Sequence, residues 1–84
     1  MGERTVVVAS AHGLHARPAA LFAQAAARAS APVTVAAGDK RVNAASILSV
    51  LSLGVDRGET VTIASDDEAA LDELEQLLSI DHDA

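Results

Sequence analysis

The sequence predicts an α+β fold in which helices pack on one face of a β-sheet. Short runs rich in β-branched residues alternate with alanine-rich and leucine-rich runs of helical periodicity. Glycine and proline separate most of these runs, and no repeat, linker or low-complexity tract interrupts them. The chain has 84 residues, of which 50% are hydrophobic, so residues 1–84 are expected to form a single domain with one core.

The first half of the chain predicts a strand, a helix and a hairpin. The run RTVVVAS, residues 4–10, is rich in β-branched residues and predicts the first strand. An alanine-rich helix over 16–29 follows it. Its expected apolar face consists of Leu21, Phe22, Ala25, Ala26 and Ala29. The run VTVAAGDKRVNA, residues 33–44, predicts two short strands around a turn that begins at Gly38.

The second half predicts a helix, a strand and a second long helix. The run SILSVLSLG predicts a short helix with Ser46 as its N-cap and Gly54 just past its end. Residues 59–65, ETVTIAS, alternate as a half-buried strand does. In the last helix, Ser65 and Glu68 are expected to form a capping box. Its apolar stripe consists of Leu71, Leu74, Leu77 and Leu78. The predicted order is β-α-β-β-α-β-α.

Charge is distributed unevenly along the chain, whose net charge is −6. Residues 12–54 contain four basic residues and one acidic residue, whereas residues 56–84 contain ten acidic residues and one arginine. The acidic part predicts a solvated helix face. An acidic chain with a single aromatic residue, Phe22, argues against a nucleic-acid-binding protein, which needs a basic surface and usually stacking rings.

Two further features of composition bear on location. Cysteine is absent, which excludes a disulfide framework and a thiolate metal site and favours a reducing compartment. The valine run near the N-terminus is too short for a signal-peptide core or a membrane span. We therefore expect a soluble, cytoplasmic protein that does not interact with membranes.

The residues best suited to chemistry cluster in AHGLHARPAA, residues 11–20. His15 falls at the start of the first helix, where N–H groups lack intrahelical acceptors and the dipole presents positive charge. This field disfavours imidazolium, so we expect His15 to keep a nucleophilic ring nitrogen. A phosphoryl group on that nitrogen would meet the guanidinium of Arg17. The amides of Ala16 and Arg17 are the expected phosphate donors, because Pro18 has no N–H.

Two other interpretations of this cluster stay open at the level of residues. His12 and His15 could form half of a metal site, but the third histidine, His82, lies in the tail and no carboxylate is close in sequence. We therefore expect no metal. In the other interpretation, His15 only caps the helix and Arg17 is a surface residue. Spacing and composition alone do not separate this structural role from a chemical one.

The motif GLHARPAA, followed later by NAASILSVLSLGV, resembles the HPr family of histidine-containing phosphocarriers of the bacterial sugar phosphotransferase system. The resemblance covers essentially the whole chain. It implies an open-faced β-sandwich, a four-stranded antiparallel sheet covered on one face by three helices. It further implies that His15 accepts a phosphoryl group on Nδ1 from phosphorylated enzyme I, assisted by Arg17, and donates it to sugar-specific enzyme IIA proteins. No cofactor of the chain itself is implied.

The resemblance also implies a docking surface for these transient partners. Its expected residues are Ala20, Ile47, Leu48 and Leu51. From the sequence alone, core packing remains the alternative for the three aliphatic residues. Lysine is frequent in the family at the positions of Gln24, Ala27, Ala45 and Ser49. The absence of these lysines is expected to weaken electrostatic steering toward acidic partners, and we expect Arg28 to replace part of the lost charge.

Ser46 has two compatible interpretations. As an N-cap, its hydroxyl accepts a backbone hydrogen bond. In many Gram-positive members of the family, the matching serine is phosphorylated by HPr kinase/phosphorylase, which inhibits transfer and creates a corepressor for catabolite control protein. Ser46 and Ile47 match that site, whereas Ala45 replaces a frequent lysine.

We expect a monomer that acts with partner transferases and is not a stand-alone enzyme. One alternative is a carrier in nitrogen or regulatory signalling. Another is a non-catalytic, regulatory or ligand-sensing α+β domain. The resemblance implies that paralogues without the histidine are regulators only, so the presence of His15 favours the carrier. His12 replaces a small hydrogen-bonding residue of the family, and the sequence assigns it no role.

Overall fold

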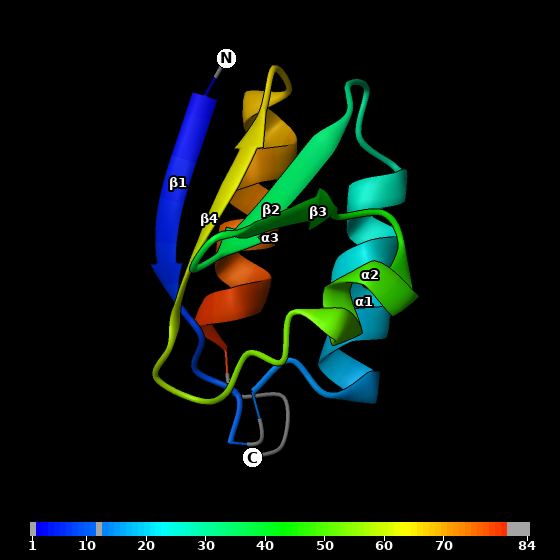
Figure 1. The fold of residues 1–84 in the computed structure, drawn as a ribbon. Coiled ribbons are helices and arrows are strands. Elements are labelled where there is room, and N and C mark those ends of the chain that lie inside the picture. Colours follow the sequence, from blue (N-terminus) through cyan, green and yellow to red (C-terminus); the bar gives the residue numbers. More distant parts are fainter. Residues whose placement is uncertain (1, 12, 81–84) are drawn as a thin grey trace.

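The fold is known from a computed structural model, which describes residues 2–11 and 13–80. The elements are β1 (Gly2–Val7), α1 (Ala16–Ala27), β2 (Val33–Ala37), β3 (Lys40–Asn43), α2 (Ile47–Ser52), β4 (Thr60–Ser65) and α3 (Glu68–Ser79). The strands form one antiparallel sheet in the order β1-β4-β2-β3. Helices cover one face of this sheet and leave the other open (Figure 1), which confirms the predicted fold class and element order.

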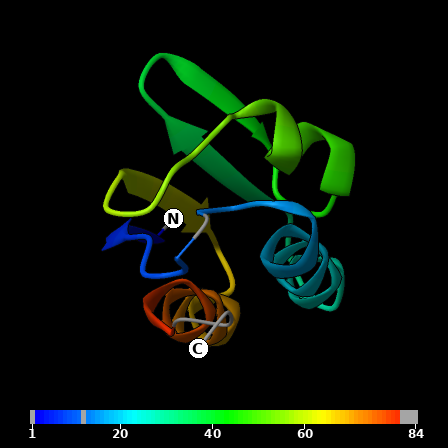
Figure 2. The ribbon, with the colours of Figure 1, turned by 90° about the horizontal axis from the view of Figure 1, so that it is seen from below.

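The core lies between the sheet and the two long helices. Figure 2 shows α1 and α3 side by side beneath the strands. From the sheet, the side chains of Val35 and Ile63 are fully buried, and they meet Phe22 of α1 and Leu71 and Leu74 of α3. Burial of each such side chain stabilises the fold by about 1.5–3 kcal/mol. None of the helices in the described part of the chain is both long enough and apolar enough to span a bilayer.

The structure confirms the predicted N-cap of α2, the glycine after its end and the glycine of the hairpin turn. The Ser46 hydroxyl accepts a hydrogen bond from the Ser49 N–H at 3.3 Å and caps α2. Gly54 has a φ of 62° just beyond the end of α2. Gly38 has a φ of 58° in the turn between β2 and β3. Both glycines adopt the left-handed backbone conformation that other residues rarely adopt.

Three predicted boundaries or faces in the first half differ from the structure. β1 ends at Val7. Beyond it, the Val8 N–H donates to the Glu59 carbonyl and the Ala9 N–H donates to the Leu78 carbonyl of α3. α1 ends at Ala27, two residues early. The prediction that Leu21 faces the core is wrong, since its side chain is 38% exposed. In a helix made mostly of alanine, the hydrophobic pattern has little contrast and does not fix which face is buried.

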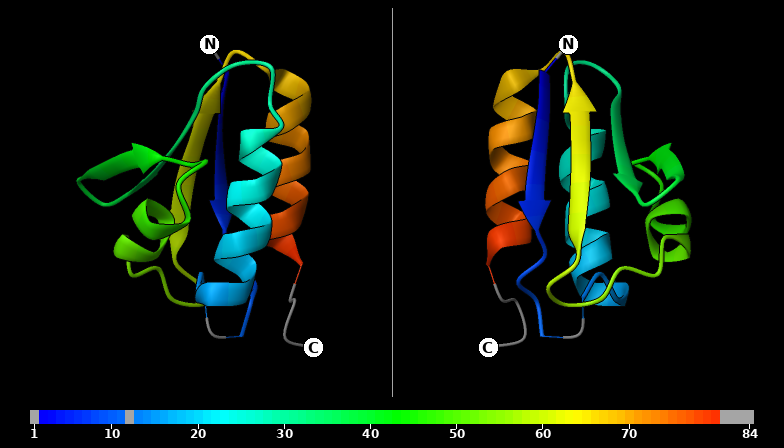
Figure 3. Two further views of the ribbon diagram at one scale, coloured as in Figure 1. Left: turned by 90° about the vertical axis from the view of Figure 1, so that its right-hand side faces the viewer. Right: turned by 60° about the vertical axis from the view of Figure 1, so that its left-hand side comes forward.

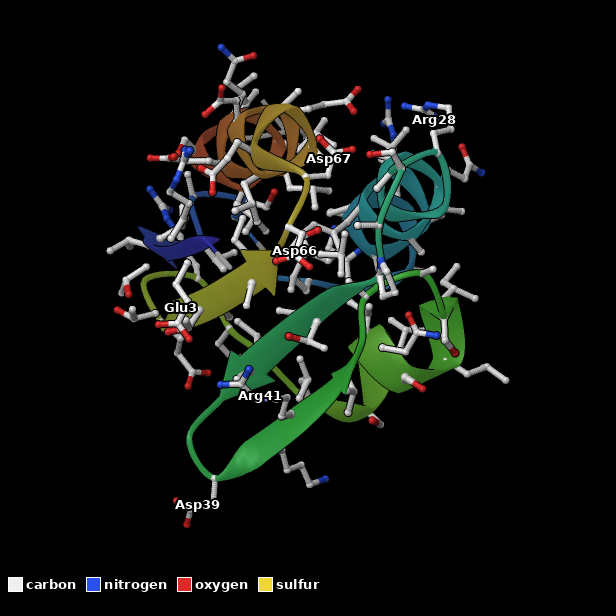
Figure 4. All side chains as sticks on the ribbon, turned by 90° about the horizontal axis from the view of Figure 1, so that it is seen from above. Glu3, Arg28, Asp39, Arg41, Asp66 and Asp67 are labelled. Atoms are coloured by element: carbon white, nitrogen blue, oxygen red, sulfur yellow. The ribbon has the colours of Figure 1, made fainter. Side chains whose placement is uncertain are left out.

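The predicted capping box of the last helix is also wrong. Ser65 is the buried final residue of β4, where its hydroxyl accepts a hydrogen bond from the Asp67 N–H at 3.0 Å. Asp67 is the N-cap of α3, and its Oδ1 accepts from the Ala70 N–H at 3.0 Å. Its Oδ2 accepts from the N–H and hydroxyl of Ser30 at 2.8 and 2.9 Å. The carboxylate therefore ties the start of α3 to the loop after α1, at the end of the molecule shown in Figure 4.

A second polar contact joins β1 to α3. Arg4 donates to Asp72 Oδ1 at 2.6 Å, to Glu68 Oε1 at 3.0 Å and to Glu75 Oε1 at 3.0 Å. These hydrogen bonds raise the pKa of Arg4, and the one with Asp72 has the largest effect. Since each residue is partly exposed, the cluster adds modestly to stability and holds the edge strand against the helix.

We predict that Asp67 makes the fold sensitive to acid. Hydrogen bonds from the Ser30 N–H, then from the Ala70 N–H and the Ser30 hydroxyl, lower the pKa of Asp67 below its ordinary value. Its contribution to stability is therefore complete above about pH 4 and is lost as the pH falls through the folded-state pKa. Asp67→Asn keeps an oxygen for Ala70 but loses the charged acceptor for Ser30, and should lower the Tm at pH 7 by about 5 °C.

The matched variant is Asp67→Ala, which removes both the cap and the link. Its Tm at pH 7 should be lower than that of Asp67→Asn. Thermal unfolding by circular dichroism at pH 7 and near pH 3 measures the difference, and the gap between Asp67→Asn and the unchanged protein should shrink in acid. A gap that stays constant with pH would assign the loss to packing.

Candidate functional site

His15 is the N-cap of α1 and is half-buried. Its backbone is extended, with φ −80° and ψ −173°, and its carbonyl accepts the first helical hydrogen bond, from the Ala19 N–H at 2.9 Å. The imidazole makes no capping hydrogen bond to the helix. The backbone of His15 thus starts the helix while its side chain has no capping role.

The first turn of α1 has the features of an anion-binding site. The N–H groups of Ala16 and Arg17 have no carbonyl four residues earlier within the helix. Both residues are exposed, and Arg17 adds a guanidinium to the positive end of the helix dipole. Pro18 is buried and has no N–H. The arrangement can hold an oxyanion attached to His15 through two amides and one cation.

The segment before His15 is fixed by the loop that follows α2. The Leu14 N–H donates to the Val55 carbonyl at 2.9 Å, and the Leu14 side chain is buried. Gly13 has a φ of 69°, and a Cβ there would overlap the Val55 carbonyl oxygen and lie 2.6 Å from Asp56 Cα. The two loops meet at the bottom of Figure 1. The sequence could not predict the contact with Val55, because a backbone carbonyl leaves no residue-type signal.

The expected docking residues lie on α1 and α2. Ala20 and Ile47 line a groove of about 230 Å³ between these helices. The side chain of Ile47 is 39% exposed and that of Leu48 is 76% exposed. Leu51 is half-buried and packs against the core, so of the three aliphatic residues of α2 it is the least available to a partner. The structure thus brings Ala20 and Ile47 together and leaves Leu48 beside them at the surface.

The described part of the chain contains no cluster of side chains of the kind that the metal interpretation requires. Within residues 2–11 and 13–80, no three histidine, cysteine or carboxylate side chains gather closely enough to hold a metal ion. His12 and His82, which entered the metal interpretation of the sequence, lie outside the described residues.

Comparison with known proteins gives consistent matches. The family described as the PTS HPr component phosphorylation site matches residues 2–79. A phosphocarrier protein HPr of Streptomyces coelicolor is 51% identical over 81 residues, which are 95% of this chain and 87% of that protein. An HPr-like protein Crh of Bacillus subtilis is 42% identical over 77 residues, 92% of this chain and 91% of that protein. The crystal structure of HPr-C-His from Thermoanaerobacter tengcongensis superposes with a TM-score of 0.88 at 42% identity, covering 93% and 91% of the chains.

We predict that Gly13 is needed to hold the start of α1. Gly13→Ala combines a strained positive φ with an overlap against the backbone at Val55 and Asp56, and should lower the free energy of unfolding by about 2–5 kcal/mol. Gly38→Ala is the matched control, because its φ is also positive but no atom lies within 4 Å of the added Cβ. It should cost about 1–2 kcal/mol.

Urea unfolding measures both losses, and amide NMR spectra should show shifts around His15 in Gly13→Ala only. Equal losses in the two variants would mean that the contact with the Val55 carbonyl does not hold the loop.

Proposed function

Because the chain belongs to the HPr family of phosphocarrier proteins, we propose that it accepts a phosphoryl group on His15 from phosphorylated enzyme I and donates it to sugar-specific enzyme IIA proteins. The observation that carries this proposal is the position of His15, which is the residue directly before the first turn of α1. The N–H groups and dipole of a helix start favour an anion at this place. A nucleophile and a phosphate-binding site thereby coincide in one turn of backbone.

In the proposed reaction, the Nδ1 lone pair of His15 attacks the phosphorus of the phosphorylated donor. A P–N bond to His15 forms as the bond between the phosphoryl group and the donor breaks, and the donor takes back its electron pair. In the second step His15 is the leaving group and the nucleophile of enzyme IIA is the acceptor. Arg17 and the amides of Ala16 and Arg17 stabilise the charge on the equatorial oxygens in both steps.

The strength of these interactions suits a carrier. A helix start stabilises a charge by roughly 0.3–1 kcal/mol, and a charged hydrogen bond from Arg17 adds about 1.5–3 kcal/mol. Since about 1.4 kcal/mol changes an equilibrium tenfold, these contacts steady the phosphohistidine without preventing onward transfer.

We propose that partners dock on Ala20, Ile47, Leu48 and Leu51, beside His15. The exposure of Ile47 and Leu48 supports this surface, because the two are neighbours on α2 and Ile47 lines the groove, so that they form one apolar patch. Burial of each aliphatic side chain stabilises a complex by at most about 1.5–3 kcal/mol, and the cost of association offsets much of this free energy. The resulting complexes are short-lived, as successive transfer to different partners requires.

A regulatory role is the second candidate, favoured by the likeness to an HPr-like protein Crh. In this role Ser46 is phosphorylated by an HPr kinase/phosphorylase and the chain acts with a catabolite control protein. Ser46 starts α2 immediately before Ile47, so a phosphate there would alter the docking surface. The presence of His15 favours the carrier over a purely regulatory domain. The same chemistry would also serve a carrier in a nitrogen-related branch.

We predict that incubation with phosphoenolpyruvate and enzyme I labels His15 with a base-stable, acid-labile P–N bond. His15→Ala should take up no label, and Arg17→Ala should be labelled about tenfold or more slowly, because one charged hydrogen bond is lost. Radiolabel uptake and phosphopeptide mass spectrometry provide the measurement. Label on His15→Ala under the same conditions would refute the carrier mechanism.

We predict that Ser46→Asp keeps or raises the Tm but slows phosphorylation of His15. A carboxylate at the start of α2 accepts the Ser49 N–H and suits the helix dipole, while its charge lies beside Ile47. Ser46→Ala should lose about 1 kcal/mol of stability and keep its transfer rate. Melting curves and transfer rates of both variants are compared with the unchanged protein. Equal transfer rates in all three proteins would leave Ser46 a helix cap only.

A further inference from the structure

The peptide group between Val55 and Asp56 is held by a hydrogen bond on each of its two sides. Its carbonyl, on Val55, accepts from the Leu14 N–H at 2.9 Å. Its N–H, on Asp56, donates to the Glu59 carboxylate, with 2.8 Å between N and Oε1. Because a peptide group is planar, fixing the N–H also fixes the direction of the carbonyl. The Glu59 side chain therefore orients the acceptor that holds the residue before His15.

The backbone of Glu59 holds the other end of the same segment. Its carbonyl accepts from the Val8 N–H at 2.9 Å, and the Gly58 N–H donates to the Val8 carbonyl at 2.9 Å. The Glu59 N–H donates to the Asp56 carbonyl at 3.1 Å, which closes a turn. Figure 3 shows the chain after β1, in blue, meeting the chain before β4, in yellow-green, at the lower end of the sheet. One residue thus fixes the start of the segment between β1 and α1 directly, and its end through one peptide group.

The charge of the Glu59 carboxylate adds to this arrangement. An ionised acceptor forms a stronger hydrogen bond than a neutral one, and it polarises the peptide group so that the carbonyl on the far side becomes a better acceptor. The Val55 side chain is buried, so the peptide group has a fixed place and the Glu59 contact sets its rotation. Since Glu59 is exposed, water competes for the carboxylate and the gain in overall stability is small.

Resting on the proposed function, we propose that Glu59 is a positioning residue for phosphoryl transfer. It holds the Val55 carbonyl toward the Leu14 N–H and thereby keeps the backbone of His15 where the imidazole can meet the donor phosphorus in line. Because the proposed docking residues lie on α1 and α2, loss of the Glu59 carboxylate should slow the transfer step and leave docking unchanged.

The test measures transfer and docking separately, with recombinant enzyme I of Streptomyces coelicolor, phosphorylated beforehand by phosphoenolpyruvate, as the probe. Single-turnover labelling by rapid quench, over a range of chain concentrations, gives a maximal transfer rate and a half-saturating concentration. Glu59→Ala should lower the maximal rate about three- to tenfold and leave the half-saturating concentration within about twofold. Glu59→Gln keeps an oxygen for the Asp56 N–H, so its maximal rate should stay within about twofold of the unchanged protein.

Amide hydrogen exchange provides a reading that a general loss of stability would not give. In Glu59→Ala the Leu14 N–H should exchange about tenfold faster, whereas the N–H of Ile63, in the middle of the sheet, should keep its rate. Glu3→Ala is the matched control, because it also removes one exposed carboxylate, but from the end of β1 that lies away from Val8. Its transfer and exchange rates should both be unchanged.

Three results would overturn the positioning role and leave the carrier function standing. The first is a normal maximal rate in Glu59→Ala, with or without a higher half-saturating concentration. The second is a Glu59→Gln variant as slow as Glu59→Ala, and the third is equal acceleration of exchange at Leu14 and Ile63. Absence of label on the unchanged protein would overturn the proposed function itself, so the two failures are distinguishable.

Discussion

The geometry of the proposed phosphoryl site depends on one backbone contact, in which the Leu14 N–H donates to the Val55 carbonyl. Gly13 lies against the same carbonyl in a conformation that other residues adopt only with strain, so the chain before α1 has little room to move. Main-chain bonds and a buried leucine thus position the backbone of His15. These contacts leave the first turn of α1 at the surface, where Ala16 and Arg17 are exposed.

The charged and the apolar surfaces of the molecule lie on different sides of α1. On the α3 side, Arg4 gathers three carboxylates and Arg28 engages a fourth, so charge is used to hold elements of the fold together. On the α1–α2 side, small side chains leave shallow grooves in which Ile47 and Leu48 stay exposed. This separation keeps the carboxylates of α3 away from a site whose proposed cargo is itself an anion.

Local sequence signals predicted the element order and the position of His15 because residue type largely determines turns, caps and helix starts. They failed where the tertiary structure decides between equivalent local choices. Ser65 and Asp67 are both good N-caps, and the pairing of Ser65 with β1 and β2 leaves the cap to Asp67. Leu21 was misplaced because an alanine helix has no distinct apolar face. The support from Val55 was beyond prediction, since any residue offers the same carbonyl.

The sheet order has a consequence for how the protein is made. β1 pairs only with β4, so Gly2 meets Ser65, and the chain after β1 is anchored on residues 55–59. On the ribosome, α1 and the β2–β3 hairpin can form from local contacts, whereas these long-range pairings wait until the second half of the chain has emerged. A nascent chain that ends before β4 holds His15 on a helix with no fixed start. The start of α1 therefore takes its final position late in synthesis, as the last strand enters the sheet.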